Sequence, residues 1–117
     1  MKKNVIFLFI VLMISGCQNS NELKQRFDSA INEVVLLENK NLKTDEKFNR
    51  GDFGIAVYSE GKYIELIYDL NNEQVESLYK YNDDEKVYKH YPHTQENLEE
   101  AQVDLEKLSY TENIGLK

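Results

Sequence analysis

The spacing of the apolar residues changes along this chain, and this change limits the fold more than any other feature. Between residues 23 and 35, apolar side chains recur at steps of four, four, three and one, as they do on one face of a helix. They are Leu23, Phe27, Ile31, Val34 and Val35. From residue 53 they alternate instead, as in a strand with one buried face. A helix followed by strands predicts an α+β fold.

The first helix is expected to lie in the core of the domain. Ser20 is a residue type that caps helix N-termini, and the pattern extends as far as Lys43. Polar side chains interrupt the apolar stripe and argue against a membrane helix: Asp28, Asn32, Glu33 and Glu38. The polar segment 39–52, which follows, predicts the end of the helix and a loop.

Two antiparallel strand pairs are expected after this loop. In the first pair, residues 53–57 and 63–68 flank Gly61, which supplies the positive φ of a tight turn. In the second pair, residues 75–81 and 87–91 flank a polar turn rich in Asn and Asp. Together they predict a four-stranded antiparallel meander.

The third element of the meander follows a turn at Asn71 and Asn72 and fits two patterns. Asn71 and Asn72 tolerate the left-handed backbone of a tight turn and are expected to join the two pairs. Val75, Leu78 and Tyr79 fit helical spacing as well as strand spacing. The third element therefore stays open between strand and helix.

A second helix is expected at the C-terminus. Pro92 ends the last predicted strand, and Thr94 is suited to cap a helix. Its buried stripe is expected to be Leu98, Ala101, Leu105 and Leu108. The predicted fold is α+β: an N-terminal helix packed on a four-stranded antiparallel meander, with an extra C-terminal helix, in one monomeric domain of residues 22–117.

The first 16 residues have the layout of a signal peptide. Lys2 and Lys3 precede ten uninterrupted apolar residues, 5–14. A permanent membrane span needs about 20 apolar residues, so this run is too short to be one. Residues 17–21 are then expected to form a short tether before the domain.

The residues Ile14, Ser15, Gly16 and Cys17 resemble the lipobox of bacterial lipoproteins at all four positions. The resemblance implies that the lipoprotein-processing enzymes attach a diacylglyceryl group to the Cys17 thiol and cut between Gly16 and Cys17. It leaves open whether the new amino group is acylated as well, for example with palmitate. Two or three acyl chains hold a protein stably in a membrane, so the resemblance implies an anchor on the extracytoplasmic face of the cell membrane.

The order of elements behind this lipobox is similar to that of the cystatin-like fold lipoproteins of low-GC Gram-positive bacteria. That resemblance implies a roll in which the sheet wraps the first helix, and it implies no chemistry. The composition agrees with such an origin: 12 Lys against 2 Arg and 12 Asn against 3 Ala is the amino-acid bias expected of an AT-rich genome.

The charge of the chain limits its partners. Without Lys2 and Lys3, 12 basic residues remain against 21 acidic ones, a net charge of −9 for residues 17–117. Nucleic acid is excluded as a partner because its phosphates require clustered Lys and Arg. A basic protein or peptide is favoured because long-range attraction speeds its encounter with an acidic surface.

Tyrosines offer a candidate binding face. Seven of the eight lie between residues 58 and 91, mostly on predicted strands. Tyr79 and Tyr88 are predicted to form part of an aromatic face that engages the basic partner. The alternative is that these rings make cross-strand pairs and only cover the sheet.

The sequence contains little else that indicates chemistry. His90 and His93 are three apart, but Pro92 breaks the helical geometry that would let them share a metal, and zinc needs at least three protein ligands. No metal site and no cofactor are therefore expected. Arg50, Gly51 and Asp52 spell the integrin-binding tripeptide, which arises readily by chance.

Inhibition of cysteine proteases and catalysis are not expected. The chain lacks Trp, and the segment 74–77 lacks the Gly of the inhibitory hairpin of true cystatins. The one thiol is assigned to the lipid, and no Ser lies in a Gly-rich elbow. Two interpretations remain open: a non-catalytic accessory or binding lipoprotein, for instance of a mobile element, or an exclusion or immunity lipoprotein that blocks phage, plasmid or toxin.

Overall fold

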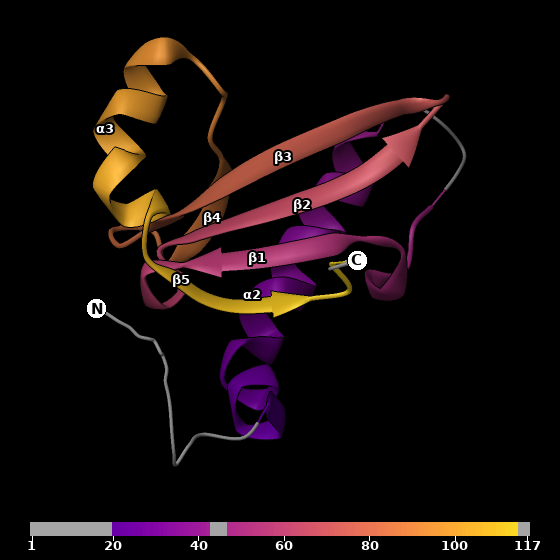
Figure 1. The fold of residues 1–117 in the computed structure, drawn as a ribbon, viewed down its shortest axis with the longest axis horizontal. Helices are drawn as coiled ribbons and strands as arrows, with labels where there is room; N and C mark the ends of the chain where they lie inside the picture. The colour runs from indigo at the N-terminus through magenta and orange to yellow at the C-terminus, as the bar shows by residue number, and fades with distance from the viewer. Residues whose placement is uncertain (1–19, 43–46, 115–117) are drawn as a thin grey trace.

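The structure is a computed structural model, and it describes residues 20–42 and 47–114 (Figure 1). The signal peptide, Gly16 and Cys17 lie outside the described residues. The elements are, in chain order, α2 (Ser20–Asn41), η1 (Arg50–Asp52), β1 (Gly54–Tyr58), η2 (Ser59–Gly61), β2 (Tyr63–Leu70), β3 (Glu73–Asn82), β4 (Val87–His90), α3 (Gln95–Leu105) and β5 (Leu108–Glu112). The domain is α+β, as predicted. None of the helices in this part of the chain is both long and apolar enough to cross a membrane.

The helix α2 is the core helix that the apolar spacing predicts. Figure 1 shows it running behind the sheet, across its strands. It begins at Ser20 and ends at Asn41, and Phe27, Ile31 and Val34 are buried against the sheet. Their spacing of four and three residues keeps them on one helix face, so burial of this stripe accounts for the helix.

The predicted four-stranded meander is confirmed, and the turn residues singled out in the sequence have the positive φ predicted for them. Gly61 has a φ of 100°, and Asn71 and Asn72 have φ values of 54° and 69°. The third element is a strand, with Val75 opposite Tyr68 in the antiparallel register of β2 and β3. Tertiary pairing with β2 thus decides between two patterns that the local sequence allowed.

The sheet has a fifth strand, which no pattern in the sequence predicts. Its order is β4-β3-β2-β1-β5, and β5 pairs antiparallel with β1 (Figure 1). Leu108 therefore belongs to β5 and is 58% exposed, so its assignment to the buried stripe of the last helix was wrong. The strand forms because it pairs with the backbone groups at the free edge of β1.

The helix α3 is the predicted C-terminal helix in a shorter form. The Thr94 hydroxyl accepts a hydrogen bond from the Asn97 amide at 3.1 Å, which confirms the cap. Of its stripe only Ala101 is fully buried, together with Tyr63 and Leu78 of the sheet. The helix α3 thus covers one end of the sheet face that points away from α2, which we call the outer face (Figure 1).

Candidate functional site

The inner face of the sheet, which packs against α2, contains the two tyrosines predicted to bind a partner. Tyr79 is 1% exposed and Tyr88 is 7% exposed. The Tyr79 hydroxyl donates to Glu38 at 2.7 Å, and the Tyr88 hydroxyl donates to the Gly61 carbonyl oxygen. The prediction that Tyr79 and Tyr88 form an accessible binding face is therefore wrong, because both rings fill the core and both hydroxyls are bonded inside it.

Burial also changes the acidity of these phenols. Desolvation is the main reason why the pKa of Tyr88 is raised to about 12, and the nearby charge of Glu33 acts in the same direction. Desolvation and the hydrogen bond to Glu38 raise the pKa of Tyr79 above its ordinary value. Both groups therefore stay neutral donors at physiological pH.

Glu38 is a buried carboxylate, although the sequence analysis placed it among the polar interruptions of the helix. It is 6% exposed. Three hydroxyls donate to it: Tyr68 and Ser77 to Oε2, the latter at 2.7 Å, and Tyr79 to Oε1. The two carboxyl oxygens have acceptor sites for all three hydroxyls, so the group is well satisfied. We assign it a structural role that holds α2 in register with β2 and β3.

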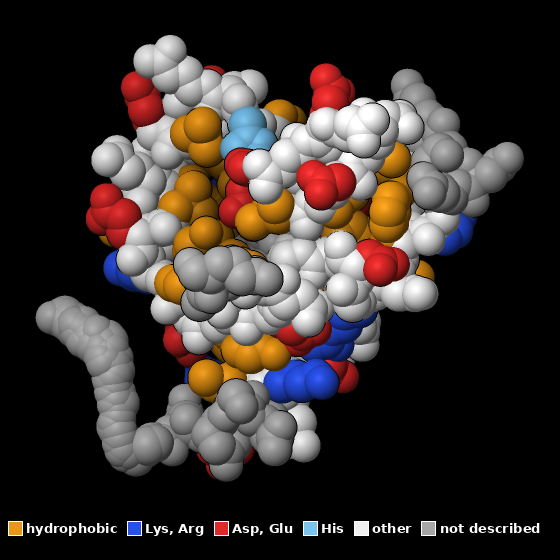
Figure 2. All heavy atoms as spheres, turned by 45° about the vertical axis from the view of Figure 1, so that its right-hand side comes forward, with side chains coloured by type: hydrophobic (Ala, Val, Ile, Leu, Met, Phe, Trp, Pro, Cys, Tyr) orange, Lys and Arg blue, Asp and Glu red, His pale blue; other side chains and the backbone are white. Residues whose placement is uncertain are grey.

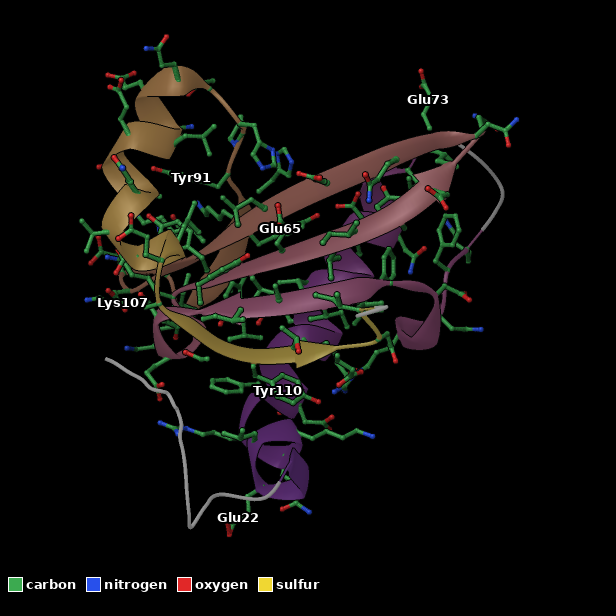
Figure 3. The ribbon with its side chains drawn as sticks, in the orientation of Figure 1. Glu22, Glu65, Glu73, Tyr91, Lys107 and Tyr110 are labelled. Carbon is green, nitrogen blue, oxygen red and sulfur yellow. The ribbon has the colours of Figure 1, made fainter. Side chains whose placement is uncertain are left out.

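The outer face contains a cluster that no sequence pattern indicated. Glu65 on β2 stands opposite Leu78, and Glu76 on β3 stands opposite Ile67. In an antiparallel pair these positions are diagonal neighbours on one face. Figure 3 shows the Glu65 side chain on the side of the sheet away from α2. His93, from the segment between β4 and α3, completes the group, which we call the Glu65–Glu76–His93 cluster.

The three side chains approach closely. One ligating atom from each lies within 4.8 Å of the others, and His93 Nε2 is 3.8 Å from Glu65 Oε2. The pKa of Glu65 is raised above its ordinary value mainly by partial burial, and the charge of Glu76 raises it further. His93 and a hydrogen bond with Tyr58 act in the opposite direction.

The segment that presents His93 is held firmly at both ends. The Tyr91 amide donates to the Leu78 carbonyl oxygen at 2.7 Å. The Pro92 carbonyl oxygen accepts from the Asn97 side chain at 2.9 Å, beside the Thr94 cap. The imidazole is thus positioned over β2 and β3 by backbone and capping bonds.

The cluster borders an open hollow of about 290 Å³ between the outer face and α3. The hollow is lined by Tyr58, Glu65, Glu76, Leu78, His93, Leu98 and Leu105. Figure 2 shows a pale-blue histidine side chain beside red carboxylates, with hydrophobic side chains around them. The hollow therefore offers a ligand two carboxylates and an imidazole at one side and apolar walls at the other.

The structure separates the two histidines that the sequence places three residues apart. His90 packs its ring against Tyr79, with centroids 5.5 Å apart, at the edge of the inner side. His93 faces the carboxylates on the outer side. The two rings therefore have different neighbours, and the partners of His93 were not predicted. Those partners lie 17 and 28 residues before it, with no local spacing to indicate them.

The integrin-like tripeptide is part of the scaffold. The Arg50 side chain is 18% exposed and pairs with Asp28 of α2 and Glu112 of β5. A guanidinium held by two carboxylates is not presented to a partner, so the structure gives no support to an adhesive role.

Comparisons of the chain with protein-family models, with curated proteins and with solved structures found no match.

Proposed function

We propose that this chain is a lipid-anchored surface lipoprotein of a bacterium, and that its folded domain binds a ligand and does not catalyse a reaction. The observation that carries the anchor is the complete lipobox Ile14–Cys17 directly behind a ten-residue apolar run. The lipid on Cys17 would place the domain on the extracytoplasmic face of the cell membrane.

The start of α2 supports a short tether. The helix begins at Ser20, three residues after Cys17. Three residues span at most about 11 Å even when fully extended. A lipid on Cys17 would therefore hold the N-terminal end of α2 close to the membrane surface, and the sheet would lie farther out along the helix.

We propose further that the domain is a cystatin-like roll. The support is the long helix α2 lying across one face of the antiparallel meander β1–β4, which is the arrangement expected for that fold. The strand β5 and the helix α3 are additions to the pattern. An accessory role in a mobile element belongs to this proposal, because it rests on the same resemblance.

The outer hollow is where we place the ligand site. The inner face is filled by α2, whereas Glu76 and His93 on the outer face are exposed and Glu65 is partly exposed. The net charge of −9 after the signal peptide favours a basic protein or peptide as the macromolecular partner. Such a partner would meet exposed carboxylates here, and its association rate would fall as salt rises.

The anchor is tested by metabolic labelling with a fatty-acid analogue. We expect the wild type and Gln18→Ser, which keeps the thiol, to be labelled equally, and Cys17→Ser to be unlabelled. An inhibitor of the lipoprotein signal peptidase should make the precursor of the wild type accumulate. Labelling of Cys17→Ser at the wild-type level would disprove the anchor.

A further inference from the structure

We propose that the Glu65–Glu76–His93 cluster binds one divalent transition-metal ion, with Zn²⁺ as the expected ion. The cluster joins two carboxylates on neighbouring strands to an imidazole from a third segment, with ligating atoms within 4.8 Å of one another. Carboxylate oxygen and imidazole nitrogen are both common zinc ligands, and three protein ligands are enough for a site that keeps an open position. The proposal rests on the ligand-binding role proposed for the outer hollow and adds a metal ion there, which a donor atom of the partner would contact.

The separations between the ligating atoms are close to those of a zinc site. Around zinc, with bonds of about 2.1 Å, tetrahedral ligand atoms lie about 3.4 Å apart. His93 Nε2 and Glu65 Oε2 are already 3.8 Å apart. The remaining contraction is available to side chains that are not fully packed, since the Glu65 and His93 side chains are 18% and 34% exposed and Glu76 is exposed.

The placement of His93 distinguishes this cluster from a patch of surface acids. The imidazole does not lie on the sheet; it is brought there by a segment held through Tyr91, Pro92 and Thr94. An oxygen-only cluster would suit Ca²⁺ or Mg²⁺. The imidazole shifts the preference to the transition metals, for which nitrogen is a good ligand.

The residues that line the hollow determine what else a bound ion would contact. Leu98 and Leu105 of α3 and Leu78 of β3 line it beside the cluster. The fourth position of a bound ion would be taken by water, or by a donor atom of a partner that enters the hollow. A ligand-binding domain could use the ion in this way as the polar anchor point of an otherwise apolar pocket.

The test uses the full-length chain with Cys17→Ser, in detergent, so that no thiol competes for zinc. Titration calorimetry with ZnCl₂ at pH 7.5 should show one saturable site per chain, and CaCl₂ and MgCl₂ should give none at the same concentrations. Added singly to this chain, Glu76→Gln and His93→Ala should weaken binding at least about tenfold. Glu73→Gln, on the same strand, and His90→Ala are the matched controls and should bind as the parent does.

A second readout is independent of any variant's folding. In ¹⁵N NMR of the parent chain, zinc should shift the ring nitrogens of His93 and leave those of His90 unchanged. Absence of saturable binding to a folded chain, or binding that survives both substitutions with no His93 shift, would overturn the metal site and leave only a side-chain contact of His93 with Glu65. The lipid anchor is judged by labelling alone, so the two proposals fail separately.

Discussion

The guanidinium of Arg50 donates two hydrogen bonds to the carboxylate of Glu112, from Nε to Oε2 at 2.7 Å and from Nη2 to Oε1 at 2.9 Å. Its third nitrogen, Nη1, contacts Asp28 and donates to Asn32 at 3.1 Å, both on α2. One side chain in η1 thus ties the helix to β5, the strand that sequence patterns did not predict. Bidentate pairs of this kind are the stronger and more specific ion pairs.

Replacing this arginine should destabilise the domain. Arg50→Met is expected to lower the free energy of unfolding by about 2 kcal/mol, because Glu112, whose side chain is 14% exposed, loses its bidentate donor and keeps only the hydrogen bond from the Tyr110 hydroxyl. Urea denaturation followed by circular dichroism measures the change. Arg26→Met is the matched control, since Arg26 pairs with Glu60 in the open and should cost less than about 1 kcal/mol. Equal losses in the two variants would contradict this account.

The same pair makes stability depend on pH. Hydrogen bonding from Arg50 is the main cause that lowers the pKa of Glu112 below its ordinary value of 4.5. The unfolded chain then binds a proton that the folded chain does not, so this contribution is present above about pH 4.5 and is lost as the pH falls through the lowered pKa. Glu112→Gln should flatten the fall of the unfolding free energy as the pH drops below the ordinary glutamate pKa of 4.5. If the unfolding free energy of Glu112→Gln depends on pH as steeply as that of the wild type, this prediction is wrong.

The buried carboxylate of Glu38 gives a third prediction. Glu38→Ala leaves the hydroxyls of Tyr68, Ser77 and Tyr79 without their common acceptor. We expect a loss of about 3 kcal/mol or more, since each unsatisfied buried group costs about 1–3 kcal/mol. Thermal and urea unfolding measure it, with the exposed Lys40→Ala on the same helix as the control. A loss no larger than that of the control would show that the three hydroxyls find other partners.

Tyr79 should behave as a core residue. Tyr79→Ala is expected to cost about 3–5 kcal/mol, because it removes a ring that is 1% exposed and leaves a cavity. A scan of unfolding temperature should therefore show a large decrease or no cooperative transition. If the Tyr79→Ala domain is folded and as stable as the wild type, the assignment of Tyr79 to the core is wrong. An accessible aromatic face would then be the better interpretation.

Removal of β5 should expose the edge of β1. A chain that ends at Lys107 loses the pairing of Ile55, Ala56 and Val57 with residues 110–112. Native-state hydrogen exchange should show those β1 amides that donate to β5 losing protection, while amides paired between β2 and β3 retain more. Unchanged protection throughout β1 would mean that β5 adds little to the sheet.

Local sequence patterns were sufficient to predict the features that depend on neighbouring residues. The stripe Phe27–Val34, the positive φ of Gly61 and Asn72, and the Thr94 cap depend on neighbours within a few residues, and each was predicted correctly. The strand β5 was missed because Leu108 continues the helical spacing of α3, and only the unpaired edge of β1 makes it a strand.

The sequence by itself determined the α+β class, the turns at Gly61 and Asn72, and the motif on which the lipid anchor is proposed, whereas the strand character of β3 was decided by its pairing with β2. The tertiary structure decided which polar groups are buried and which meet. In the sequence, Glu38 resembles an ordinary acidic residue on a helix surface. In the fold, hydroxyls from β2 and β3 donate hydrogen bonds to it and bury it. Glu65, Glu76 and His93 come together only because strand register and a capped helix place them on one face. Pairing energies depend on distances in space, and no spacing along the chain encodes those distances when the partners are tens of residues apart.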